Sequence, residues 1–349
     1  MRFSSFCAVC ALFVLSDVAC ASDASAETKG SETIVIDAGP GIKEISPILG
    51  WNRCMGDTAE SISQWKRWWT YLRMKEPVIM DWIDGVKIKI YPTNEVYRSI
   101  YVNGKYDPNV TALVKALLKS GDTFIDVGSN CGYVSLAVIK KLGKEGKVIA
   151  IEPSSRDYKR LVENVDINKL DSQIKTIQMA AGDRLGSKTM LIASEERSNS
   201  NTLANKFAFQ GIEKAKTEQV NVTTIDNIVN TENLTRVDVI KLDVEGSEAR
   251  CLEGAAETIK KFRPAIIIGI NSEALSYNKR TVADIEKFLA DNKYKMYDIK
   301  NKSFELIEVK HFEKMDSYVG VCLPEEMPAP TLPKAEKIGC FDKVKRFFK

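Results

Sequence analysis

The stretch TFIDVGSNCGY, residues 123–133, decides the fold. Thr123 to Asp126 is mainly apolar before its last residue, which predicts a short buried strand. Gly128 and Gly132 then allow a tight turn, because glycine adopts a positive φ angle without steric cost. A helical pattern follows from Tyr133 to Leu142. A strand, a glycine-containing turn and a helix in this order form the first unit of a nucleotide-binding α/β sheet.

The spacing within this turn distinguishes between cofactors. The dinucleotide fingerprint is G-x-G-x-x-G, whereas this chain has D-x-G-x-x-x-G from Asp126 to Gly132. Asp126 ends the strand, where a pyrophosphate would meet a negative charge. This argues against an NAD-dependent oxidoreductase and favours S-adenosylmethionine, whose amino-acid end is cationic. A turn with a purely structural role is the alternative.

Composition and charge limit the possible functions. The chain has 349 residues, of which 44% are apolar and 28% charged, so it is long enough for one large or two small globular domains. The net charge of +3 gives no indication of nucleic-acid binding. His311 is the single histidine, which excludes a zinc site built on several histidines. A divalent metal is possible, but the sequence does not indicate one.

The two ends of the chain differ in character from its centre. Residues 1–21 predict a secretory signal peptide, because an apolar run, Phe6 to Val18, precedes the small-x-small sequence Ala19 to Ala21. We therefore expect an exported or periplasmic protein; a cytoplasmic protein with an apolar N-terminus is the alternative. Residues 22–76 predict a linker and a Trp-rich amphipathic helix, and residues 324–349 a proline-containing, basic tail.

That tail offers one possible partner. Its last part, residues 337–349, mixes lysine and arginine with phenylalanine, a pattern typical of peripheral contact with an anionic membrane. A solvated tail, or a helix packed on the domain, is the alternative.

Between these ends, residues 77–323 predict one α/β domain. Residues 82–106 alternate as strands do, with a turn at Asn103-Gly104. Further strands are predicted at 123–126, 147–151, 174–179, 237–242, 264–270, 295–299 and 317–323, and helices at 109–118, 133–142, 156–168, 247–262 and 281–291. Repeated β-α units with short links indicate a doubly wound, parallel sheet. Residues 187–222 interrupt this pattern, and we expect them to form an insertion over the carboxyl edge of the sheet, where substrates bind.

Acidic residues follow several of the predicted strands. Glu152 ends the second strand, where a carboxylate can accept hydrogen bonds from both hydroxyls of a ribose; a surface carboxylate is the alternative. Asp183 follows the third strand and is placed to contact an adenine amino group. Asp243 and Glu245 follow the fourth strand, and both carboxylates are predicted to point into the cleft.

Six segments carry a resemblance to a known family. FIDVGSNCGY, VIAIEPS, AAGD, VTTIDNI, VIKLDVEGSEARCLEGA and FRPAIII, in this order, resemble the FkbM-type S-adenosylmethionine-dependent methyltransferases from about Tyr91 to Val321. The resemblance implies a class I methyltransferase sheet of seven strands, mostly parallel with an antiparallel last strand, preceded by an N-terminal helical and β-hairpin extension. It also implies methyl transfer to a hydroxyl, often on a sugar, glycan or related small molecule.

The resemblance assigns roles to the candidate residues. Glu152 would hold the ribose and Asp183 the adenine, and Asp243 and Glu245 would face the acceptor. The methionine end of the cofactor would be held by the turn and its flanking carboxylate, that is, by Asp126, Gly128, Ser129, Asn130 and Gly132. The chain departs from the family after the fifth strand, where Gly269-Ile270-Asn271 stands in place of E-I-H.

The identity of the base stays open at this stage. Asp243 is the first choice, Glu245 the second and His311 the third. Asp243 and Glu245 could instead hold a divalent metal that acidifies the hydroxyl. A different class of protein, a catalytically inactive binding protein of the secretory or envelope compartment that has kept the fold, is the alternative to the enzyme.

Overall fold

The computed structural model describes residues 59–207, 216–300, 305–312, 318–330 and 332. The predicted signal peptide, the linker that follows it and the basic tail at 337–349 lie outside the described residues. Residues 67–336 form one compact unit. α3 (Ala59–Leu72) belongs to the predicted Trp-rich helix. Among the described residues, no helix has the length and apolar character needed to cross a bilayer.

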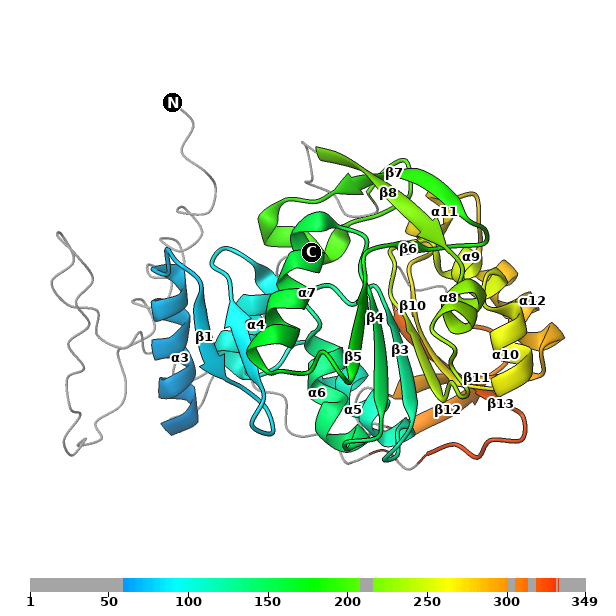
Figure 1. The fold of residues 1–349 in the computed structure, drawn as a ribbon, viewed down its shortest axis with the longest axis horizontal. Coiled ribbons are helices and arrows are strands. Elements are labelled where there is room, and N and C mark those ends of the chain that lie inside the picture. Colours follow the sequence, from blue (N-terminus) through cyan, green and yellow to red (C-terminus); the bar gives the residue numbers. More distant parts are fainter. Residues whose placement is uncertain (1–58, 208–215, 301–304, 313–317, 331, 333–349) are drawn as a thin grey trace, which may run out of the picture. The chain divides into compact units, whose positions relative to one another are not determined.

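The unit of residues 67–336 is built on an eight-stranded sheet (Figure 1). Its strands, in spatial order, are β12 (Glu305–Val309), β11 (Tyr294–Lys300), β13 (Tyr318–Pro324), β10 (Ala265–Ile270), β9 (Val239–Leu242), β3 (Thr123–Val127), β4 (Lys147–Ile151) and β5 (Ile174–Ile177). β5, β4, β3, β9 and β10 pair in parallel, whereas β13 is antiparallel to both β10 and β11. The predicted fold class, with its antiparallel last strand, is confirmed. β12, which extends the sheet beyond seven strands, was not predicted.

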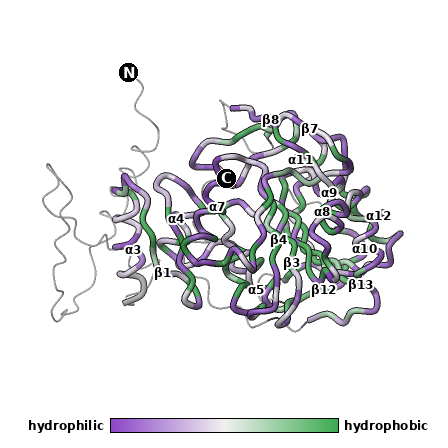
Figure 2. Tube along the Cα trace, in the orientation of Figure 1, coloured by the Kyte–Doolittle hydropathy of each residue, from purple (hydrophilic) through white to green (hydrophobic). Residues whose placement is uncertain are grey.

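Helices cover both faces of this sheet, as Figure 1 shows. The helices of one face are α5 (Pro108–Leu117), α6 (Tyr133–Leu142) and α7 (Ser155–Ile167). Those of the other are α8 (Ile225–Thr231), α9 (Glu248–Glu253), α10 (Ala256–Phe262), α11 (Ser272–Tyr277) and α12 (Val282–Asp291). Because β3 is covered on both faces, all its side chains are buried, and Figure 2 shows that the central strands are mostly hydrophobic.

The prediction of strands throughout residues 82–106 was wrong in its second half. β1 (Val78–Asp81) and β2 (Lys87–Ile90) form an antiparallel hairpin, but α4 (Glu95–Asn103) is a helix. The side chain of Asn94 caps its first turn, and Gly104, at φ 75°, ends it. Strong capping signals at both ends therefore outweigh an apolar pattern that also fits a strand.

The predicted helix at 247–262 is two helices, because α9 ends at Glu253 and α10 begins at Ala256. Gly254 lies at the break. A Cβ atom there would lie 1.9 Å from the carbonyl oxygen of Gly182, so the backbone approaches a neighbouring segment too closely for any side chain.

The predicted insertion forms a small sheet of its own. β8 (Lys216–Thr223) pairs with β6 (Ala180–Ala181) in parallel and with β7 (Gly186–Ile192) antiparallel. A short 3₁₀ helix, η2 (Glu195–Ser200), follows β7. We call residues 193–202 the strap, because they bond to several elements at the carboxyl end of the main sheet.

Candidate active site

The turn after β3 has positive φ angles at Gly128 (74°), Asn130 (51°) and Gly132 (80°). A Cβ atom at position 128 would lie 2.0 Å from the backbone oxygen of Asp243, and one at position 132 would lie 2.6 Å from Leu161 Cδ1. Close packing against backbone therefore requires glycine at position 128, whereas at position 132 it is the positive φ that favours glycine. The turn packs between α7 and the loop that follows β9.

Beneath the turn lies a buried group of charges that includes Lys241, a residue that the sequence did not single out. Asp126 is fully buried, accepts a hydrogen bond from Ser135 Oγ (2.7 Å) and pairs with Lys241 Nζ through its other oxygen (3.2 Å). Lys241 Nζ also donates to the carbonyl of Gly128 (3.3 Å) and lies 3.6 Å from Asp243 Oδ2. Burial lowers the pKa of Lys241, but the nearby carboxylates of Asp126 and Asp243 outweigh it and hold that pKa above its ordinary value.

This arrangement bears on the role predicted for Asp126. Both of its oxygens face protein groups, so the carboxylate fixes the turn from below. Direct contact between Asp126 and the cofactor stays a prediction. The signal that points to Lys241 is a single lysine within the apolar strand VIKL.

Glu152, at the end of β4, joins the turn to α7. Its Oε2 accepts a hydrogen bond from the backbone N–H of Asn130 (2.9 Å), and its Oε1 accepts one from Ser154 (3.0 Å). Burial, with a smaller contribution from Asp157, raises the pKa of Glu152 to about 8, although the two backbone donors oppose this. The structure thus brings Glu152 and the turn together, and the role of Glu152 in holding the ribose stays a prediction.

The two carboxylates after β9 differ in their surroundings. The Asp243 side chain is 44% exposed. Glu245 has a φ of 50°, and burial, with the charges of Asp243 and Glu248, holds its pKa well above the usual range. Glu248, which was not predicted, accepts hydrogen bonds from the backbone N–H groups of Val244 and Gly246 and so fixes this loop. Asp243 is therefore the open carboxylate of the pair.

The two remaining candidate residues are Asp183 and His311. Asp183 pairs with Arg250 of α9 at 3.1 Å, so its carboxylate already has a cationic partner. His311 has an 82% exposed side chain and lies 3.2 Å from Glu286 of α12. This surface position does not support His311 as the base.

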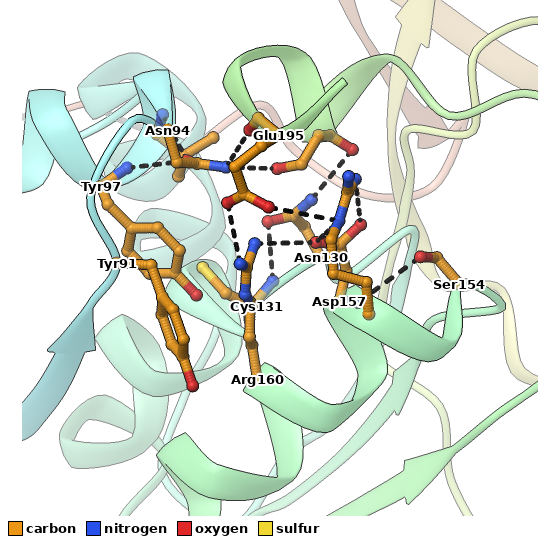
Figure 3. A network of polar contacts seen from close by, with 12 residues as sticks. Tyr91, Asn94, Tyr97, Asn130, Cys131, Ser154, Asp157, Arg160 and Glu195 are labelled. Atoms are coloured by element: carbon orange, nitrogen blue, oxygen red, sulfur yellow. Dashed lines mark hydrogen bonds and ion pairs between the residues drawn. The ribbon is translucent and has the colours of Figure 1, made fainter. Parts of the chain in front are cut away.

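The strap lies across this group of residues, as the sequence predicted for the insertion. It bonds to the turn through Asn130 Nδ2 and the carbonyl of Ser198 (3.4 Å), and to the loop after β9 through Thr202 Oγ1 and the carbonyl of Glu245 (2.6 Å). Figure 3 shows its other end, where the side chains of Asn94, Glu195 and Arg160 point toward one another. There, Asn94 Nδ2 donates hydrogen bonds to Glu195 O (2.9 Å) and Ser198 Oγ (2.7 Å). Arg160 forms an ion pair with Glu195 (2.8 Å). Asn201 donates to Asp157 (2.8 Å), and Arg156 donates to Ala193 O (2.9 Å).

The residues around the turn fit a polar ligand that carries hydroxyl and ammonium groups. Ser129 Oγ, on a side chain 1% exposed, has no hydrogen-bond partner among the described residues. Each Glu152 oxygen accepts one backbone donor and has a second lone pair left. Ser129, Asn130 and Glu152 are thus the residues that would hold S-adenosylmethionine. For a metal, the part of the chain that the structure describes contains no group of three or more His, Cys, Asp or Glu side chains placed to bind one.

The sheet order and the glycine turn define the class of the protein. A mostly parallel sheet whose antiparallel strand β13 lies between β10 and β11, with a glycine turn after β3, is the class I methyltransferase arrangement. Residues 126–296 match the family described as "Methyltransferase FkbM domain". Within residues 126–296, just under half of its length, the chain therefore matches an FkbM-type methyltransferase domain.

The chain is also similar to the following proteins. "Methyltransferase sdnD" of Sordaria araneosa is 24% identical over 185 residues, which cover 46% of this chain and 68% of that protein. The crystal structure of Methyltransferase FkbM from Methylobacillus flagellatus KT is 17% identical with a TM-score of 0.38, over 59% of this chain and 44% of that one. P. horikoshii TYW2, solved in complex with MeSAdo, is 13% identical with a TM-score of 0.35, over 71% and 70%. This chain thus spans less than half the length of the M. flagellatus protein.

Proposed function

We propose that this chain transfers the methyl group of S-adenosylmethionine to a hydroxyl oxygen of a sugar, a glycan or a related small molecule. The observation that carries the proposal is the open carboxylate of Asp243 beside the glycine turn of an FkbM-type domain. When bound, the cofactor supplies an electrophilic methyl group. The chain's own residues must then orient the acceptor and take up its proton.

Asp243 is the residue best suited to take up that proton. Ionising a hydroxyl of pKa near 13 before attack would cost about 8 kcal/mol at neutral pH. A carboxylate that accepts the proton as the bond forms lowers this cost. Glu245 is less suited, because its raised pKa favours the protonated form. Alignment of acceptor and methyl group contributes further, since orientation is worth roughly 7–11 kcal/mol in favourable cases.

Binding of the cofactor would fall to the turn and its neighbours. Ser129 Oγ would take a hydrogen bond from or to the ligand, and Glu152 would accept from the ribose hydroxyls. The strap, which contacts both the turn and the loop after β9, would close over the bound molecules and exclude water. Export through the predicted signal peptide stays part of the proposal, and it would require a supply of S-adenosylmethionine outside the cytosol.

The proposal is tested by calorimetric titration of S-adenosylmethionine into the full chain. We expect a Kd in the micromolar range, which corresponds to about −8 kcal/mol, and weaker binding by Glu152→Ala. Release of S-adenosylhomocysteine is then measured with a panel of methyl glycosides and oligosaccharides. Asp243→Asn should bind the cofactor as the unaltered chain does but release no product. Folded protein without measurable affinity for S-adenosylmethionine would contradict the proposal and favour the non-catalytic binding protein.

A further inference from the structure

Lys241 contacts more groups than charge balance in the core requires. It is paired in register with Asp126 on the neighbouring strand β3 and is only 2% exposed. Asp126 alone would neutralise it. The same ammonium also lies 3.6 Å from Asp243 Oδ2 and donates to the carbonyl of Gly128. One oxygen of the open carboxylate thus lies within ion-pair distance of an ammonium group that is buried in the sheet.

The other oxygen of Asp243 lies over a glycine in the adjacent strand. A Cβ atom at Gly269 would lie 2.9 Å from Asp243 Oδ1. Gly269 lies inside β10, pairs with Val319 of β13, and is not among the residues with a positive φ. The backbone therefore does not require glycine at this position, and glycine weakens a strand interior. Because glycine has no side chain, position 269 leaves room for the Asp243 carboxylate.

We infer that Lys241 and Gly269 are positioning residues that fix the orientation of the Asp243 carboxylate toward the acceptor. Lys241 anchors Oδ2, and the absence of a side chain at position 269 leaves Oδ1 its space. Neither residue needs to touch the acceptor or the cofactor. The inference rests on the proposed function, because it assigns these two residues to the reaction that Asp243 would assist.

The first test is Gly269→Ala, with Gly186→Ala as its matched control. Both glycines lie in strands without a positive φ, but nothing lies within 4 Å of a Cβ atom at Gly186. The atom that meets the new methyl group of Gly269→Ala is the end of a side chain, so the fold can adapt while the carboxylate moves. We expect unchanged affinity for S-adenosylmethionine and a kcat for S-adenosylhomocysteine release that falls roughly 10- to 100-fold. Activity equal to that of the control, or a parallel loss of cofactor affinity, would overturn the inference.

The second test separates positioning from charge balance. The double variant Lys241→Met/Asp126→Asn removes the whole buried pair, a change that proteins often tolerate, whereas Lys241→Met alone would leave a buried carboxylate without a cation. Asp126→Asn alone serves as the control for any loss of cofactor binding. If Lys241 only balances Asp126, the double variant will turn over like Asp126→Asn. If it positions Asp243, turnover will fall at least about tenfold below that of Asp126→Asn.

A third readout does not depend on the proposed activity. In full-length protein labelled with [4-¹³C]aspartate, the Asp243 carboxyl signal is assigned by its absence in Asp243→Asn. We expect it to shift in Gly269→Ala and in the double variant, and to stay in place in Gly186→Ala. If the chain fails to bind S-adenosylmethionine but these shifts occur, the proposed function falls while the two residues still position Asp243. Identical signals in all variants would refute the positioning role.

Discussion

Gly128→Ala tests whether the turn and the loop after β9 are packed as one unit. Gly128 has a φ of 74°, and placing a non-glycine residue in the left-handed region costs roughly 1–2 kcal/mol. The new Cβ atom would also lie 2.0 Å from the carbonyl oxygen and 2.9 Å from the carbonyl carbon of Asp243. These are backbone atoms that cannot rotate away, and such overpacking costs roughly 1–3 kcal/mol more. We therefore expect a total loss of about 2–5 kcal/mol of unfolding free energy.

Gly121→Ala is the matched control, because Gly121 precedes the same strand and has a φ of 84° but nothing within 4 Å of its would-be Cβ atom. It should lose only the conformational part, roughly 1–2 kcal/mol. Equilibrium unfolding in urea measures both losses from the shift of the midpoint at constant slope. Equal losses in the two variants would refute the close packing of Gly128 against Asp243.

Three further predictions follow from burial and hydrogen bonding. The free energy of unfolding should fall as the pH rises from about 5 to 8. In the folded chain Glu152 (pKa about 8) and Glu248 (pKa about 7) keep their protons over much of this range, whereas in the unfolded chain they lose them near pH 4.5. Melting temperatures that rise over this range would contradict the prediction. Ser129→Ala should leave stability unchanged or slightly higher, since the hydroxyl has no partner among the described residues, but weaken S-adenosylmethionine binding about tenfold in calorimetry; unaltered affinity would remove Ser129 from the site. Asn201→Ala should speed hydrogen exchange in the strap by removing its bond to Asp157, and added S-adenosylmethionine should slow that exchange in the unaltered chain; a strap insensitive to the ligand would exclude its closing role.

The central part of the fold could be predicted from the sequence for a physical reason. β3 and β4 are covered on both faces, so their sequences are nearly continuous apolar runs, and glycine marks the turn after β3. α6 and β4 therefore have the predicted bounds. β12 was missed because it is an edge strand with mostly exposed or half-buried side chains, so its sequence has no comparable pattern.

Only part of the site could be predicted, because the sequence does not show which strands pair with one another. Asp243 and Glu152 were identified because each follows a strand, which places both at one edge of the sheet. The partners of Lys241 could not be predicted, because the sequence does not show that β9 lies beside β3 in a register that sets Lys241 against Asp126. The same missing contact explains why Asp126 was assigned wholly to the cofactor, although it is occupied by Lys241 and Ser135.

Burial separates the roles of carboxylates that look alike in the sequence. The carboxylate of Glu248 accepts hydrogen bonds from the backbone N–H groups of Val244 and Gly246. Asn278 donates to the carbonyl of Gly246, and Thr202 donates to that of Glu245. The backbone of this loop is thus held at several points, and a left-handed residue at position 245 is part of its path. This loop therefore fixes the backbone that carries Asp243, whose side chain is 44% exposed, as its proposed role as the base in methyl transfer would require.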